Sequence, residues 1–315
     1  MEDYRIRIRL LSPLGTPWQS DTVFGHLCWQ VALGRGDIGI VELLEPFRQG
    51  RPPFVLSDGF PGDLLPRPLI PEPRSDGCSA ASYAAARERK RSRFISPADL
   101  AAFRRGDDSL ADPIAISWRL FEVPHAAIQR HTGTTGPTDE AEGGSFFSTE
   151  LAALEEGDTI SLYLRAEGDW GQWVPAMLKE MSPLGFGRDR STGAGAYEVL
   201  DAEPFGEFGP IAGANAFLSL SSYCPAHEDP MLGYWRVRLK YGKLGETASK
   251  GNPFKRPLVQ FEPGAVFYVD GEPVRPYYGR SVSDIAPGMP EAIQCGYTLA
   301  VACRRPEADR PAETQ

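Results

Sequence analysis

Hydrophobic and polar positions alternate strictly near the start of the chain. Over residues 4–10, Ile6, Ile8 and Leu10 alternate with three arginines, which predicts a half-buried strand whose arginines share one face. After a turn rich in proline and glycine, apolar residues recur at helical spacing from Val23 to Val31. This spacing predicts a helix over 20–33, capped by Ser20 or Asp21 and stopped by Gly34–Gly36.

The same two periodicities recur along the chain. They predict a short helix over 40–47, a strand that begins at 54 and a helix that begins at 97. They also predict a strand that begins at 159, a helix that ends at 181, and a strand over 196–200. This order is β-α-β-β-α-β. The segments after 216 have strand-like patterns and few helical ones, so we expect a second, degenerate unit and an α+β fold.

Domain boundaries follow from these patterns. We expect an N-terminal domain over 1–206, a C-terminal domain over 207–303, and a flexible tail over 304–315, because that last stretch has no apolar residue beyond alanine.

A glycine-rich stretch separates the helix that ends near Met181 from the strand after it. It contains Gly185, Gly187, Gly193 and Gly195, and between the pairs lie Arg188, Arg190, Ser191 and Thr192. Glycines allow positive φ and a concave nest of N–H groups for phosphate oxygens, and arginine forks match phosphate geometry. The order helix, loop, strand is the reverse of a dinucleotide site, so an anion other than a nucleotide cofactor is favoured. The alternative is a plain turn with solvated arginines.

Charge limits the ways in which this chain can bind nucleic acid. Its 315 residues carry a formal net charge of -9, with 33 Lys and Arg against 42 Asp and Glu, whereas nucleic-acid-binding domains are usually basic. Any RNA contact must therefore use local clusters. One candidate is the run over 87–93, with Arg87, Lys90, Arg91 and Arg93; another is a hairpin tip over 128–147, with Arg130, His131, Thr132 and Gly133. Each is equally interpretable as a solvated surface.

Cysteine and motif content favour a cytoplasmic protein without cofactors. The five cysteines are odd in number and scattered, which suits a reducing compartment. No apolar run is long enough to cross a membrane. Cys224 and His227 have metal-ligand spacing but no second pair, so we expect no metal.

Four segments resemble the CRISPR-associated RAMP superfamily, and most closely the family of the fourth subunit of type III-A (Csm) effector complexes. They are the glycine-rich loop with a basic residue and Ser/Thr before G-x-G, Arg130-His131-Thr132-Gly133-Thr134, Leu56-Ser57-Asp58-Gly59-Phe60-Pro61 with Leu65-Pro66-Arg67-Pro68, and Ser20-Asp21-Thr22-Val23-Phe24-Gly25-His26-Leu27-Cys28-Trp29. The likeness is weakest after Gly206.

The resemblance implies two ferredoxin-like (RRM-like) domains with a β-hairpin thumb. It implies a non-catalytic subunit of a heteromeric ribonucleoprotein that caps the 5′ handle of the crRNA, using the first helix (Ser20, Asp21, Phe24) and the glycine-rich loop. The partners implied are a large polymerase-like (Cas ten-type) subunit and an adjacent backbone RAMP subunit. Relatives often carry an aromatic where this chain has Ala194 and Ala196, so base stacking from the loop would depend on Phe186 and Tyr197.

Two alternatives stay open at the level of sequence. His26 on the first helix suits the general base of a metal-independent crRNA-processing endoribonuclease, although such enzymes keep the glycine-rich loop close to the C-terminus. The other alternative is an assembly subunit whose acidic surface binds protein and no RNA.

Overall fold

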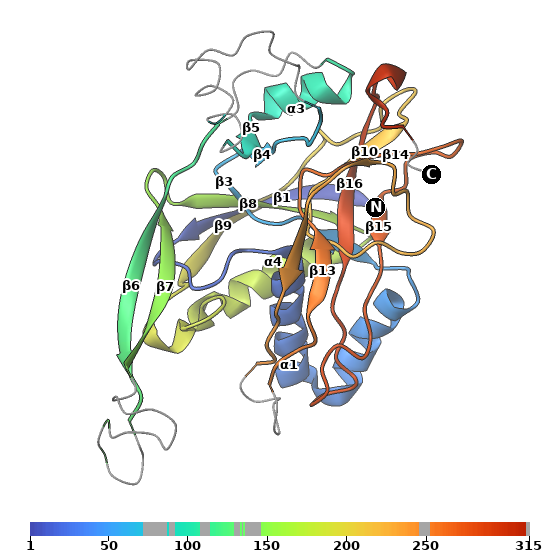
Figure 1. Cartoon of the computed structure of the whole chain (residues 1–315). Helices are drawn as coiled ribbons and strands as arrows, with labels where there is room; N and C mark the ends of the chain where they lie inside the picture. Colours follow the sequence, from blue (N-terminus) through green and yellow to red (C-terminus); the bar gives the residue numbers. More distant parts are fainter. Residues whose placement is uncertain are drawn as a thin grey trace.

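The computed structural model describes residues 1–71, 92–107, 114–128, 146–245 and 253–312, together with Arg87, Gly133 and Thr135. All strand pairs that it describes are antiparallel. The fold is a mixed α/β arrangement of two main sheets with helices beside the first (Figure 1).

The first sheet has the strand order β2-β8-β1-β9. These strands are β1 (Glu2–Leu10), β2 (Phe54–Leu56), β8 (Thr159–Ala166) and β9 (Tyr197–Pro204), and the short β3 (Phe60–Pro61) also pairs with β8. Helix α1 (Ser20–Arg48) follows β1 and helix α4 (Trp170–Met181) follows β8. The predicted β-α-β-β-α-β succession is therefore present, with further elements inserted between β2 and β8.

The alternation in β1 has the predicted consequence. Ile6 and Ile8 are fully buried, and α1 and α4 lie together below the sheet in Figure 1, where they join the same apolar core. On the other face the three arginines of β1 each pair with an acidic residue of β9 in the matching register: Arg5 with Glu203, Arg7 with Asp201, and Arg9 with Glu198. These arginines are neutralised within the sheet and are not available as an RNA-binding face.

Helix α1 differs from the prediction at both ends. Its N-cap is Gln19, and Ser20 and Asp21 lie inside the first turn. The backbone N–H of Ser20 donates instead to Asp58, 2.9 Å away on the β2–β3 turn. The expected stop appears as a kink at Gly36, where φ is +64° and ψ is -161°, after which the helix continues to Arg48.

The second sheet has the order β11-β14-β10-β16-β15. Its strands are β10 (Ala216–Ser219), β11 (Gly233–Tyr234), β14 (Val266–Tyr268), β15 (Tyr277–Gly279) and β16 (Tyr297–Cys303). Within the described residues, no α-helix follows Met181, and only a 3-10 turn, η3 (Glu307–Asp309), lies beyond β16. This agrees with the predicted shortage of helices in this half.

Smaller elements flank the two sheets. Strands β6 (Trp118–Ala126) and β7 (Phe146–Leu154) form a hairpin that projects from the molecule, at the left of Figure 1. Strands β4 (Leu65–Pro66) and β5 (Phe94–Ile95) pair beside α3 (Pro97–Arg104). The predicted start of this helix at residue 97 is confirmed, and Ser96 caps it by accepting the Asp99 N–H at its Oγ. Strands β12 (Val237–Lys240) and β13 (Leu258–Phe261) form a further pair.

Part of the C-terminal segment makes contacts with the rest of the chain. We predicted a flexible tail from Arg304, but Arg304 N–H donates to Arg104 O at 2.9 Å. Arg305 is buried, and its guanidinium lies 4.4 Å from the centre of the Phe103 ring. Arg304 and Arg305 are therefore held against α3, while Asp309 and Arg310 contact Tyr234 and Asp270. The sequence does not show this, because an arginine stem can be buried when its charge is paired.

Candidate nucleic-acid interface

The glycine-rich loop joins α4 to β9 through two 3-10 turns, η1 (Ser182–Leu184) and η2 (Arg190–Thr192). All four of its glycines have positive φ, between +68° and +97°, as predicted. At Gly195 a Cβ atom would lie 2.0 Å from Phe186 O. Glycine is required there both for the positive φ and because the backbone at residue 195 passes close to the backbone at Phe186.

The backbone N–H groups of this loop are mostly bonded within the chain. Gly187 N–H donates to His26 Nε2, Arg188 N–H to Thr16 Oγ1, Gly195 N–H to Pro13 O, and Ala196 N–H to Ser12 Oγ. Those of Phe186, Gly193 and Ala194 bond inside the loop. The predicted phosphate nest is therefore not open along most of the loop; the bonds fasten the loop to the segment between β1 and α1.

The polar side chains at the outer edge of the loop remain accessible. Arg190, Ser191, Thr192 and Gly193 are exposed. Arg188 has 48% of its side chain exposed; it lies 3.2 Å from Asp189 and donates to Glu150 O of the β6–β7 hairpin. This edge is the part of the predicted site that can meet a phosphate.

The aromatic residues of the loop are not accessible. Phe186 is 1% exposed and stacks on Trp18 with ring centres 4.0 Å apart. Tyr197 is 3% exposed, and its hydroxyl donates to Leu178 O. The expectation that these rings stack on bases is wrong, because both are used to hold the loop on the core.

The predicted residues of the first helix are buried as well. Ser20 and Asp21 are each 4% exposed and Phe24 is 3% exposed. Burial alone would raise the pKa of Asp21, but Lys240 pairs with it and Gln260 donates to it, so its pKa is lowered. Ser20 and Asp21 join the first helix to the second half of the chain, whereas Phe24 packs against Phe47 and Phe54. At this burial none of the three side chains is placed to contact RNA.

His26 lies directly beneath the glycine-rich loop. Its Nε2 accepts the Gly187 N–H at 3.2 Å, and burial, with Arg190 nearby, lowers its pKa to about 4. The imidazole is therefore neutral at physiological pH and serves as an acceptor for the loop backbone.

The two predicted basic clusters are only partly described. Arg87 and Arg93 are exposed, and Gly133 has a φ of +65°. Lys90, Arg91, Arg130, His131 and Thr132 lie outside the described residues. Arg93 lines the cavity described next.

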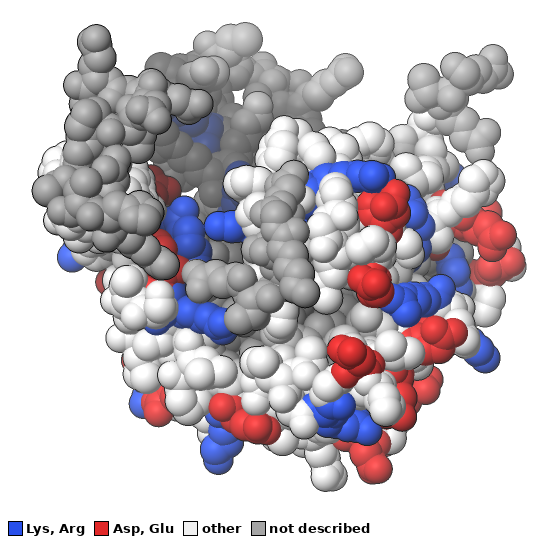
Figure 2. Space-filling view, turned by 90° about the horizontal axis from the view of Figure 1, so that it is seen from below, with Lys and Arg blue, Asp and Glu red and all other residues white. Residues whose placement is uncertain are grey.

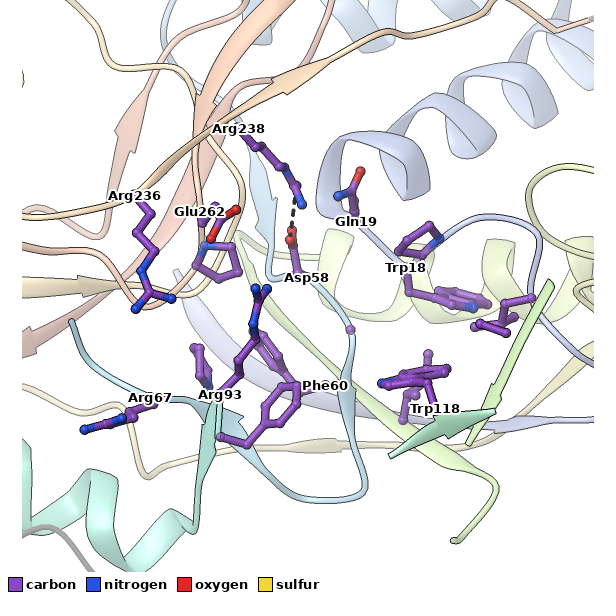
Figure 3. A pocket seen from close by; sticks show the side chains of 18 of the residues that line it. Trp18, Gln19, Asp58, Phe60, Arg67, Arg93, Trp118, Arg236, Arg238 and Glu262 are labelled. Carbon is purple, nitrogen blue, oxygen red and sulfur yellow. Dashed lines mark ion pairs between the residues drawn. The ribbon is translucent and has the colours of Figure 1, made fainter. Parts of the chain in front are cut away.

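A cavity of about 500 Å³ lies beside the glycine-rich loop, and sequence reasoning missed it. Four arginines line it: Arg67, Arg93, Arg236 and Arg238. They come from segments far apart in the sequence and no local motif joins them, so only the fold reveals the cluster. Figure 3 shows these side chains together with Trp18, Phe60 and Trp118.

Among the described residues, the charge distribution, the metal-binding groups and the helix lengths point to no further site. On the face seen in Figure 2, basic and acidic side chains are interspersed. Within the described residues, no group of three or more His, Cys, Asp or Glu side chains is placed to hold a metal ion. No helix in the described part of the chain has the length and apolar character needed to cross a bilayer.

Comparison with solved structures identifies the fold. The chain matches no protein-family model and no curated protein. It is similar to Csm4 in the crystal structure of a Csm1–Csm4 cassette in complex with cA4, with a TM-score of 0.62 and 17% identity over 96% of this chain and 99% of that one. It is also similar to Csm4 in the Csm3–Csm4 subcomplex of a type III-A CRISPR-Cas interference complex, with a TM-score of 0.59 and 13% identity over 97% of this chain and 100% of that one.

The fold is thus one that solved structures of type III-A CRISPR-Cas subunits also have. The chain has a Csm4-like fold along nearly its whole length, and this fold agrees with the resemblance that the sequence motifs indicated.

Proposed function

We propose that this chain is a non-catalytic subunit of a type III CRISPR effector complex and holds the 5′ handle of the crRNA against the edge of its glycine-rich loop. The main support for the proposal is that the loop has a fixed backbone and exposed polar side chains. Its backbone is fastened by Ser12, Pro13, Thr16 and His26, while Arg188, Arg190, Ser191 and Thr192 stay at the surface. A preorganised edge with two guanidinium groups and two hydroxyls suits phosphates and 2′-hydroxyl groups.

The domain organisation expected of such a subunit agrees with the strand orders. We propose that 1–206 is a ferredoxin-like domain, because its sheet has the order β2-β8-β1-β9 with α1 and α4 as its two helices. Residues 207–303 would be a degenerate second copy, with no α-helix among its described residues. The β6–β7 hairpin is the candidate thumb, inserted before β8.

The solved structures with this fold suggest the protein partners. They pair Csm4 with Csm1 in one case and with Csm3 in the other, so we infer a large polymerase-like subunit and an adjacent backbone RAMP subunit for this chain.

A surface for a protein partner is present on the β12–β13 pair. Val237, Leu239 and Val259 are each about half exposed, and Leu239 lies opposite Val259 in the register. Exposed apolar side chains grouped in this way are typical of protein-binding surfaces. Replacing Leu239 and Val259 together by lysine is expected to abolish co-purification of a neighbouring subunit and to leave RNA binding by the isolated chain unchanged. Unchanged co-purification of both neighbours would show that this surface docks neither.

The nuclease alternative depends on His26. A general base must reach the attacking hydroxyl, whereas His26 is partly buried and its Nε2 accepts a backbone N–H. These contacts support a role in positioning the loop.

Co-expression with the partner subunits tests the proposal. We expect the purified complex to contain uncut RNA, seen in its 260/280 nm absorbance ratio and in extracted RNA, and we expect the Arg188→Ala/Arg190→Ala variant to retain less of it. The matched control is Arg35→Ala/Arg256→Ala, which removes the same charge from two exposed ion pairs elsewhere.

Two results would contradict this function. A complex that assembles normally and contains no RNA would leave the chain an assembly subunit. Metal-independent cleavage of repeat RNA that is lost in a His26→Ala variant would make it a nuclease.

A further inference from the structure

The β6–β7 hairpin is joined to the rest of the molecule by few hydrogen bonds. It projects as a two-stranded ribbon (Figure 1), and such a ribbon is at best marginally stable by itself in water. Within the described residues, three hydrogen bonds join its strands to other elements. Two of them pair the backbone of Leu14 with that of Ala152, at 2.7 and 2.9 Å, and in the third the Arg188 guanidinium donates to Glu150 O. The direction in which the hairpin projects therefore depends on this short stretch of β7.

The segment between β1 and α1 holds both the hairpin and the glycine-rich loop. Leu14, which is 5% exposed, pairs with Ala152 of β7. The residues on either side of Leu14 hold the loop, because Pro13 O accepts a loop N–H at 2.8 Å and Thr16 Oγ1 accepts the Arg188 N–H at 3.0 Å. The base of the hairpin and the loop are thus fixed to the same few residues.

The side chain of Arg188 is the movable part of this connection. Its backbone is packed closely, since a Cβ at Gly15 would lie 2.7 Å from Arg188 O. Its side chain is 48% exposed, with Nε 3.2 Å from Asp189 and another nitrogen donating to Glu150 O. A phosphate carries a full charge and accepts two N–H groups of one guanidinium, so it is a stronger acceptor than a neutral carbonyl. A phosphate at the loop edge therefore competes with the hairpin for Arg188.

We propose that the bond from Arg188 to Glu150 O is a latch that holds the β6–β7 hairpin to the glycine-rich loop, and that a phosphate of the bound RNA opens it. The hairpin is then free to pivot about the Leu14–Ala152 pair. The proposal rests on the function proposed above, because RNA at the loop edge supplies the phosphate. Arg188 is accordingly a positioning residue for the hairpin as well as a contact for RNA. Because coupling between two sites is reciprocal, loosening the hairpin strengthens RNA binding.

Hydrogen exchange in the full-length chain tests the latch. Mass spectrometry of peptides that cover 146–154 measures how often β7 opens. Arg188→Ala is expected to increase this exchange in the absence of RNA, because the latch is removed. The matched control is Arg190→Ala, since Arg190 is also exposed at the loop edge and has no described bond to the hairpin. Its exchange should stay at the wild-type level, although both variants are expected to bind RNA more weakly.

Addition of RNA separates a latch from a bond that is merely structural. A saturating concentration of an eight-nucleotide single-stranded RNA is expected to raise the exchange of 146–154 in the wild type towards the level of Arg188→Ala. It is expected to cause no further rise in that variant. A bond with a structural role alone would leave the exchange of the wild type unchanged by RNA.

Two proline variants of β7 measure the reciprocal effect. Ala152→Pro removes the N–H that Leu14 O accepts, and the β6–β7 ladder is kept because this N–H does not bond to β6. We expect this variant to bind the same RNA about 5- to 10-fold more tightly, as measured by fluorescence anisotropy. The control is Ser148→Pro, whose N–H lies on the same side of β7 and is accepted by no described residue of another element. Thermal unfolding checks that both are folded, and if Ala152→Pro is not, the exchange of the arginine variants still decides.

The failure of the latch is distinguishable from the failure of the proposed function. Wild-type exchange in Arg188→Ala, or exchange in the wild type that RNA does not raise, would overturn the latch. Weaker RNA binding by Arg188→Ala/Arg190→Ala would in that case leave the proposed function standing. A complex without RNA, together with a chain that binds none, would overturn both.

Discussion

Individual buried polar residues hold the candidate interface in position. His26 accepts from the glycine-rich loop, and Asp58 accepts from both Ser20 and Ser222 and so ties the first helix to the second half of the chain. His26, Asp58 and Asp21 all lie in the sequence segments that resemble a known family. Their role as internal acceptors, however, depends on partners more than a hundred residues away, which no local pattern reveals.

His26 gives a prediction for the dependence of stability on pH. Its pKa is about 4 in the folded chain and about 6.5 when unfolded. Above pH 6.5 both states are neutral; as the pH falls from 6.5 towards 4 only the unfolded state binds the proton, so this residue removes up to about 3 kcal/mol of stability. Urea unfolding at several pH values should show a smaller loss in His26→Gln than in the wild type. Equal losses would mean that His26 is not held neutral by the fold.

Asp21 gives a prediction for the stability of the contact between the first helix and the second half of the chain. Asp21→Ala would leave Lys240, Gln260 and Gln294 without their shared acceptor, and we expect a loss of about 3 kcal/mol in the free energy of unfolding. The control is Glu42→Ala, because the pair of Glu42 with Arg35 is exposed and such pairs contribute less than about 1 kcal/mol. Similar losses in the two variants would show that the buried pair is not important for stability.

At the scale of elements, periodicity predicted most of what the structure contains. Strand β1, helix α4 and the cap of α3 have local signals, namely strict alternation, helical spacing and a Ser-Pro start. The N-cap of α1 was wrong because Asp58 supplies the acceptor from another loop. The stacking role of Phe186 was wrong because sequence does not show which side of a loop faces the core.

The loop between α4 and β9 gives a prediction about glycine. Gly195→Ala places a methyl group 2.0 Å from Phe186 O at a φ of +68°, so we expect a loss of about 3 kcal/mol from strain and overpacking together. Gly50 is the control, since its φ is +74° and nothing lies within 4 Å of its added Cβ, and Gly50→Ala is expected to cost about 1 kcal/mol. The free energy of unfolding measures both, and equal costs would show that the loop is not packed as described.

At the scale of the whole molecule, net charge is a poor guide to function. The chain is acidic overall, and the arginines of β1 are neutralised by acidic partners within the first sheet. Within the described residues, the surface that we propose for a nucleic acid is the edge of the loop, and beside it lies the cavity lined by four arginines. The loop was visible in the sequence as two G-x-G pairs. The cavity was not, because it forms only when the β6–β7 hairpin, the first sheet and the β12–β13 pair come together.

The central claim is that the edge of the glycine-rich loop binds the phosphates of the crRNA handle, and the salt dependence of handle binding tests it most directly. The affinity of the assembled complex for handle RNA should fall on a logarithmic plot against salt concentration, and Arg188→Ala/Arg190→Ala should make that slope shallower by about 1 for each phosphate that is no longer neutralised. The Arg35→Ala/Arg256→Ala control should keep the wild-type slope. A slope that is the same in all three complexes would contradict the claim.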